Sequence, residues 1–218
     1  MMTQDRDKQD RRKEKGATMT ISDRRTALAS AYDHSADVVA GVDVGQLHLP
    51  TACAEYDVAA LIDHLVGAGH RAVDLGRGQT PTGDEFPHVE LADAPELLRR
   101  AGEAAQAAWA DDARLSATTT MPWGKSYTGS TLVDMYLAEL TTHTWDLAAA
   151  TGQLDHLDSE LAIIALDAAR SMLKPEYRNQ LGEGSPFGTE VPAPANATPW
   201  ERLAAFMGRD PRHQDSLR

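Results

Sequence analysis

The residues with the clearest chemical potential lie on one predicted helix, 130–151, in the second half of the chain. Glu139 and His143 are four residues apart, and Asp146 follows one turn later. At about 100° per residue these three side chains share one arc, in the middle of the apolar stripe of the helix. Because buried unpaired charge is costly, such groups are normally paired with one another or bound to a metal. A Glu and a His at this spacing point the same way, so they can bind one cation together.

A metal site needs a third ligand from a neighbouring helix, and His64 is the best placed of the eight histidines. It lies at the edge of the apolar stripe of a predicted helix, 57–75. Two histidines and one carboxylate leave a coordination position open, which is typical of catalytic zinc sites. The same ligand types suit Fe(II), so ligand type alone does not name the metal. A buried Glu139–His143 hydrogen bond and an ordinary core-edge histidine remain the structural alternatives.

Four further residues are assigned to the surroundings of this site. Asp146 either holds the His143 ring by a hydrogen bond or faces solvent at the edge of the bundle. Trp123, Tyr127 and Tyr136 are assigned to a substrate pocket, with packing in the core as the alternative. No residue is assigned a catalytic role. Cys53 precedes a helix, whose dipole would lower the thiol pKa, but with no base nearby in the sequence a packed structural thiol is the preferred interpretation.

The predicted elements are almost all helical. Residues 130–151 have a Ser130 cap and a Gly152 stop, and residues 76–92, rich in Gly, Pro and Thr, predict a long loop that is a candidate lid. Strand signals are weak. The other helices are predicted at 22–39, 57–75, 95–110, 159–174 and from 198 to just before Gly208.

These elements predict an all-α fold, an up-and-down four-helix bundle with an irregular C-terminal extension. Three segments are expected. Residues 1–18 form a disordered N-terminal tail, residues 19–175 the metal-binding bundle, and residues 176–218 the extension with its short helix.

Composition limits the classes of function. The 218 residues are 42% hydrophobic and 25% charged, as in ordinary soluble proteins. The net charge of −12 argues against a nucleic-acid partner, and no apolar run is long enough to span a membrane. A single cysteine excludes an intramolecular disulfide, and the N-terminus lacks the apolar segment of a secretory signal, so a cytoplasmic location is expected. The expected partner is a small-molecule substrate. The oligomeric state stays open, and a homodimer is one arrangement.

Three stretches resemble one known family. Residues 50–57 and 61–65 read PTACAEYD and LIDHL, residues 139–148 read ELTTHTWDLA, and the tail contains FGTEVP at 187–192 and GRDP at 208–211. They are similar to the signatures of the DinB-like metal-binding helical bundles, in the mycothiol-dependent maleylpyruvate isomerase branch and its actinobacterial metal-binding subfamily. Tyr56 departs from the family, which usually has Trp at this packing position.

The resemblance implies a DinB-like fold and a divalent metal bound by His64, Glu139 and His143. Zinc is the expected ion, with Ni²⁺ or Fe²⁺ as alternatives. It also implies thiol-dependent chemistry with mycothiol, in a subfamily of diverse functions. We therefore expect a metal-dependent enzyme that transfers a thiol to an electrophilic small molecule, or isomerises it. The alternatives are a metalloenzyme that uses no thiol, with the metal as Lewis acid or water activator, and a non-catalytic metal- or ligand-binding bundle.

Overall fold

The computed structural model describes residues 24–81, 86–174, 178 and 188–212. The predicted N-terminal tail, 1–18, lies outside the described residues, as does most of the first part of the predicted extension.

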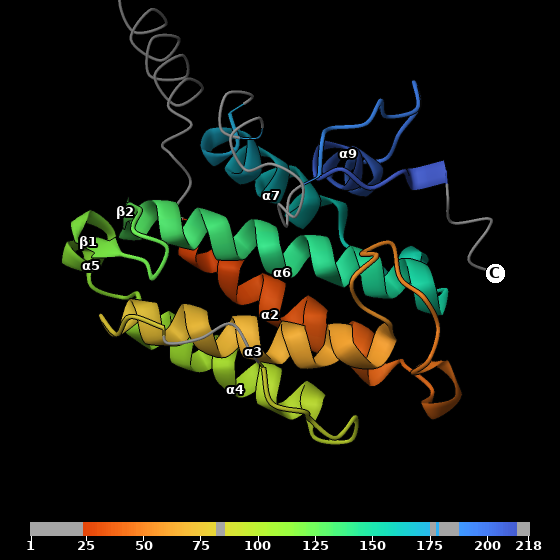
Figure 1. The fold of residues 1–218 in the computed structure, drawn as a ribbon, viewed down its shortest axis with the longest axis horizontal. Coiled ribbons are helices and arrows are strands. Elements are labelled where there is room, and N and C mark those ends of the chain that lie inside the picture. Colours follow the sequence, from red (N-terminus) through yellow and green to blue (C-terminus); the bar gives the residue numbers. More distant parts are fainter. Residues whose placement is uncertain (1–23, 82–85, 175–177, 179–187, 213–218) are drawn as a thin grey trace, which may run out of the picture.

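Four long helices form the bundle that carries the candidate site (Figure 1): α2 (Arg24–Ala40), α3 (Val58–Gly76), α4 (Ala94–Ala108) and α6 (Gly129–Thr151). Both α2 and α3 pack mainly against α4 and α6, so α2 and α3 face each other across the bundle. The connection between them, which includes the short helix η1 (Val44–Gln46), therefore crosses one end of the bundle. The expected all-α four-helix bundle is confirmed.

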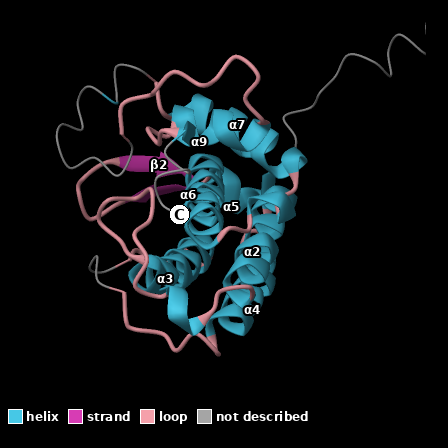
Figure 2. Cartoon of the chain, turned by 90° about the vertical axis from the view of Figure 1, so that its right-hand side faces the viewer, coloured by secondary structure: helices cyan, strands magenta, loops and turns pink. Residues whose placement is uncertain are grey.

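A second layer covers the side of α6 that faces away from α3 and α4 (Figure 2). It consists of α7 (Ser159–Met172) and α9 (Pro199–Phe206), which pack on each other and on α6. A short helix, η2 (Leu154–His156), connects α6 to α7. As a result α6 is the central helix, and every residue from 140 to 150 is buried. Polar side chains in that stretch have no water to solvate them, so they need partners within the protein.

The start of α6 differs from the expected one. Thr128 caps the helix, because its hydroxyl accepts a hydrogen bond from the amide of Thr131 at 3.3 Å. A short antiparallel hairpin, β1 (Thr118–Thr120) with β2 (Ser126–Thr128), leads directly into the helix, where the sequence had shown only weak strand signals. Strands this short show too few alternations to be recognised by periodicity. The other end is as expected, with Gly152 in the left-handed region at a φ of 76°.

The remaining element is α5 (Asp112–Ser116), a single turn that packs beside the start of α6. Among the described residues, no helix is long and apolar enough to cross a membrane.

The contact between α5 and α6 requires a glycine at position 129. A Cβ there would overlap the carbonyl oxygen of Arg114, which is backbone and cannot rotate away. Gly129→Ala is expected to lower the free energy of unfolding by about 1–3 kcal/mol because one of the two helices must shift. The matched control is Gly45→Ala, since a Cβ at Gly45 meets no atom within 4 Å. Denaturant unfolding compares the two variants, and equal stabilities would contradict the packing described here.

Candidate metal centre

The three residues expected to bind a metal meet between α3 and α6. His64 Nε2 lies 2.9 Å from Glu139 Oε1, and His143 Nε2 lies 3.5 Å from the same oxygen. The two imidazole rings are 4.6 Å apart between centroids, and the three potential ligand atoms all lie within 4.8 Å of one another. The structure therefore brings together His64, Glu139 and His143 from two helices that are distant in sequence.

The charges in this cluster depend on protons that a metal would displace. An ionised carboxylate can only accept hydrogen bonds. An imidazole nitrogen that makes a favourable contact with it must therefore carry a proton. His143 faces Glu139 with Nε2 and Asp146 with Nδ1, which favours the doubly protonated ring. Burial would lower the pKa of His143, but the Glu139 and Asp146 carboxylates outweigh burial and raise it to about 9. Burial would likewise raise the pKa of Glu139, but His143 and His64 hold it well below its usual range.

A divalent cation fits this arrangement. Two imidazole nitrogens and one carboxylate oxygen are a donor set that zinc uses, and the three atoms are close enough together to share one ion. A metal there would take over the role of the protons at the two Nε2 atoms, and binding would release protons to solvent. That this cluster holds a metal remains a prediction.

Asp146 and Arg209 hold the His143 ring from behind. Asp146 Oδ2 lies 3.0 Å from His143 Nδ1, and Arg209 donates to both Asp146 oxygens, at 3.2 Å from Nε and 3.0 Å from Nη2. Asp146 is fully buried, and Arg209 is 7% exposed. Burial alone would raise the pKa of Asp146, but the guanidinium of Arg209 is chiefly responsible for holding it below its ordinary value. An ionised Asp146 keeps a proton on Nδ1 of His143, which leaves Nε2 facing the cluster.

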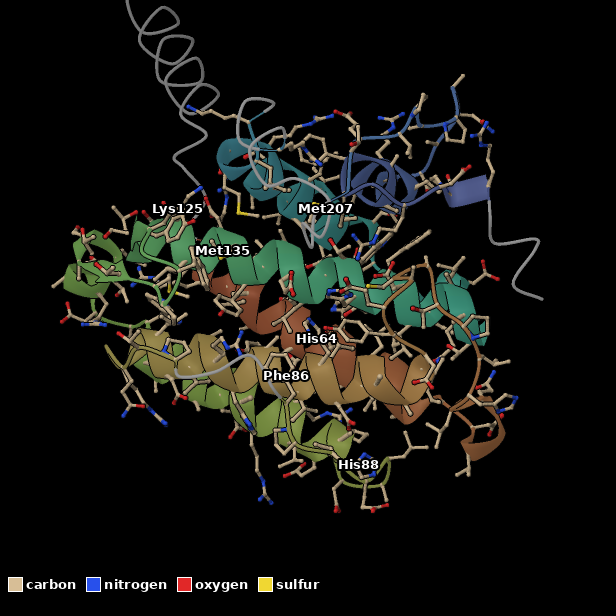
Figure 3. The ribbon with its side chains drawn as sticks, in the orientation of Figure 1. His64, Phe86, His88, Lys125, Met135 and Met207 are labelled. Carbon is tan, nitrogen blue, oxygen red and sulfur yellow. The ribbon has the colours of Figure 1, made fainter. Side chains whose placement is uncertain are left out.

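Two aromatic rings pack against His64, in addition to the hydrogen bond between its Nε2 and Glu139. Its ring lies between Tyr56, 4.9 Å away, and Phe86, 5.0 Å away and nearly perpendicular at 89°. Figure 3 shows His64 and Phe86 side by side in the middle of the molecule. His64 Nδ1 is buried and has no hydrogen-bond partner among the described residues. The orientation of the ring therefore depends on the hydrogen bond of Nε2 with Glu139 and on the two aromatic side chains.

The described part of the predicted loop 76–92 lies against α3. Phe86 packs onto Gly67, where a Cβ would overlap the aromatic ring. Asp63 of α3 binds the residues of the loop that follow Phe86. It accepts hydrogen bonds from the amide of Val89 at 2.8 Å and from the His88 ring at 3.1 Å. This part of the loop therefore holds Phe86 against the ring of His64, beside the candidate metal ligands.

A second group of possible ligands shares His143 with the first. Cys53, His143 and Asp146 offer atoms within 4.8 Å of one another. Burial raises the pKa of the Cys53 thiol, contrary to the lowering that a helix dipole would give. Asp146 already accepts hydrogen bonds from both Arg209 and His143, so its oxygens are less available to a metal. The set of His64, Glu139 and His143 is therefore the better candidate.

The structure separates the three residues assigned to a substrate pocket. Tyr136 is buried, at 6% exposure, one turn before Glu139. Trp123 and Tyr127 lie on the hairpin at the start of α6, about 15 Å along the helix from Glu139, and Trp123 is 53% exposed. In Figure 3, Lys125 of the same hairpin is far from His64. A pocket role for the three remains a prediction, and only Tyr136 lies beside the cluster.

The fold and the cluster together define a class of helical bundle with a His–Glu–His cluster between two of its helices. The chain matches the family described as the mycothiol maleylpyruvate isomerase N-terminal domain over residues 28–148, and it belongs to that family. It is also 37% identical over 186 residues to an uncharacterized protein of Mycobacterium tuberculosis strain CDC 1551 / Oshkosh. The alignment covers 84% of this chain and 95% of that protein, and an uncharacterized protein of strain H37Rv matches equally well. No solved structure was found to match the chain.

The buried pair of Asp146 and Arg209 gives a test of how the site is supported. Replacing one partner leaves the other as an uncompensated buried charge, so Arg209→Met and Asp146→Asn are each expected to cost about 3–5 kcal/mol of stability. The double variant is expected to cost clearly less than the two single costs combined. Denaturant unfolding of the four proteins gives the coupling energy.

Arg212→Met is the matched control, since Arg212 pairs with Asp210 on the surface at 68% side-chain exposure. It is expected to cost less than about 1 kcal/mol. Strictly additive effects at positions 146 and 209 would contradict a direct buried pair.

Proposed function

We propose that this protein is a metal-dependent enzyme that uses a low-molecular-weight thiol of the mycothiol type. It binds one divalent ion, most simply zinc, through His64, Glu139 and His143, and it transfers the thiol to an electrophilic small molecule or isomerises that molecule. The observation that carries the proposal is the convergence of three ligand atoms from α3 and α6. The family's description supports the thiol.

In this proposal the metal would activate the thiol. A zinc ion bound to three protein ligands would lower the pKa of an additional thiol ligand, so that a thiolate is available at neutral pH. The side chains of His64 and Glu139 are 11% and 17% exposed, whereas that of His143 is 6% exposed. The site is therefore more open on the side of His64 and Glu139, and this is where a thiol would enter.

Two residues of the protein determine which ring nitrogen of His143 carries the proton. Asp146 and Arg209 keep it on Nδ1, so that Nε2 serves as a ligand. The sulfur electron pair then forms a bond to one carbon of a substrate double bond, and the π electrons of that bond move onto a conjugated electron-withdrawing group. If that adduct takes up a proton and leaves, the outcome is thiol transfer. If the adduct rotates about the former double bond and expels the same thiolate, the outcome is isomerisation. Both outcomes suit a reducing compartment such as the cytoplasm.

The metal assignment predicts different behaviour for the two ligand groups. Glu139→Ala and His64→Ala are expected to lower the bound zinc to below about a tenth of the wild-type level, because each removes one of only three protein ligands. Cys53→Ser is expected to retain the metal, as is the control His70→Ala, an exposed histidine on the same helix. Elemental analysis of the purified proteins measures occupancy. Metal lost from Cys53→Ser but kept in Glu139→Ala would place the ion in the other group.

The thiol assignment predicts a spectroscopic signal and a kinetic requirement. In the cobalt-substituted protein, millimolar thiol is expected to produce a sulfur-to-cobalt charge-transfer band, and turnover of an electrophile is expected to need both metal and thiol. A panel of electrophiles assayed with and without each component measures this. Turnover with metal alone would point to Lewis-acid or hydrolytic chemistry, and a lack of turnover and of the band would point to a binding protein. Either result contradicts the thiol proposal.

A further inference from the structure

The ring of Phe86 packs into one face of α3. It contacts three residues that are three and four positions apart and therefore share a side of the helix: His64, Gly67 and Arg71. The His64 ring lies 5.0 Å away between centroids, and the Arg71 guanidinium carbon lies 4.7 Å from the Phe86 centroid. Between them, Gly67 leaves the space that the ring fills, because a Cβ there would overlap it. Phe86 is thus held directly beside a candidate metal ligand.

The ring reaches this face from the outside of the molecule. Phe86 is partly exposed, and the side chain of His88, two residues on, is 68% exposed. Figure 3 shows His64 in the middle of the molecule, Phe86 next to it and His88 near the edge. Two hydrogen bonds to Asp63, from the amide of Val89 and from the His88 ring, hold this segment on α3. Phe86 therefore lies on the solvent side of the His64 ring.

The same side is the one on which the cluster is accessible. The side chain of His143 is only 6% exposed, and every residue of α6 from 140 to 150 is buried. The side chains of Glu139 and His64 are 17% and 11% exposed. A molecule that reaches the open position of a bound metal must therefore pass beside these two side chains, and Phe86 packs against one of them.

We propose that Phe86 limits the size of the molecule that binds at the open position of the metal, which makes it a specificity-determining residue. This rests on the proposed function. The ring is fixed by the helix below it and by the hydrogen bonds of its own segment. A bulky group close to the metal-binding atom would have to displace it, and displacing a packed side chain costs affinity. A compact ligand meets no such obstacle.

Two substitutions on different elements disturb the same ring. Phe86→Ala removes it, and Gly67→Ala adds a methyl group on α3 that must push it away from its place beside His64. Both are expected to relax the size limit, and Gly67→Ala keeps the proposal testable if Phe86→Ala does not fold. Gly45→Ala is the matched control, because a Cβ at Gly45 meets no atom within 4 Å.

Two probes with the same donor atom and different sizes test the proposal on the cobalt-substituted protein. 1-Methylimidazole and 1-benzylimidazole both bind a metal through their unsubstituted nitrogen, and changes in the cobalt absorption spectrum give their dissociation constants. The wild type is expected to bind the smaller probe about tenfold more tightly, because the larger one must displace a packed ring. Phe86→Ala and Gly67→Ala are expected to lose most of this preference by binding the larger probe more tightly, and Gly45→Ala is expected to keep it.

A second measurement does not depend on a metal. Diethyl pyrocarbonate acylates the imidazole nitrogens that it can reach, and peptide mass spectrometry gives the rate at each histidine of the metal-free protein. His70, an exposed residue of the same helix, is the internal reference. The rate at His64 relative to His70 is expected to rise several-fold in Phe86→Ala, because the ring no longer covers His64, and to stay unchanged in Gly45→Ala. Circular dichroism checks that each metal-free variant is folded.

The outcomes separate this inference from the proposed function. If cobalt binds but the wild type does not prefer the smaller probe, or the preference survives in Phe86→Ala, the metal site stands and the role of Phe86 fails. Equal strengthening of both probes also overturns the role, because a ring that only covers the site does not select by size. If cobalt does not bind, the proposed function fails and the rate at His64 decides: a rise in Phe86→Ala supports a covering ring, and an unchanged rate overturns it.

Discussion

The burial of charged groups on α6 is the constraint on which the rest of the structure depends. This helix lies between the other helices of the bundle and the layer of α7 and α9, and every residue from 140 to 150 is buried. It nevertheless carries Glu139, His143 and Asp146. Such groups are tolerated only when partners from other elements neutralise them. Here the partners come from two directions, His64 from α3 and Arg209 from the segment after α9.

These two partners bring parts of the chain that are distant in sequence to one site. Arg209 lies beyond the residues matched by the family, 28–148, yet it touches the carboxylate that holds His143. The C-terminal layer therefore does more than cover the bundle, because it fixes the tautomer of a candidate ligand. On the other side, Phe86 and Tyr56 hold the His64 ring by packing. His143 is thus positioned by Asp146, and His64 by its hydrogen bond with Glu139 together with ring packing.

Local signals explain which features could be predicted from the sequence. The long helices and the capping residues Asp57 and Asp158 could be predicted because apolar periodicity and capping depend only on residues that are close together in the sequence. Glu139 and His143 could be recognised as a pair for the same reason, since their spacing on one helix is local. His64 was placed by its position on an amphipathic stripe, and the packing of α3 on α6 brings it to the pair.

Features that depend on long-range contacts could not be found in this way. Cys53 seemed isolated because its neighbours His143 and Asp146 are far along the chain. Arg209 occurs in a recognisable tail motif, but no periodicity links it to Asp146. The packing of Phe86 on Gly67 involves a segment for which the sequence predicted only a loop. A glycine inside a predicted helix is nevertheless a signal that another part of the chain approaches the helix closely.

The central claim is that the polar cluster between α3 and α6 binds a metal through two imidazoles and one carboxylate. X-ray absorption at the zinc edge of the zinc-loaded protein, recorded without added thiol, tests it most directly. The account predicts only nitrogen and oxygen neighbours at about 2.0–2.2 Å, with the outer-shell pattern of two imidazoles. A sulfur neighbour at about 2.3 Å, or a spectrum with a single imidazole, would contradict it, because Cys53 or another group would then be a ligand.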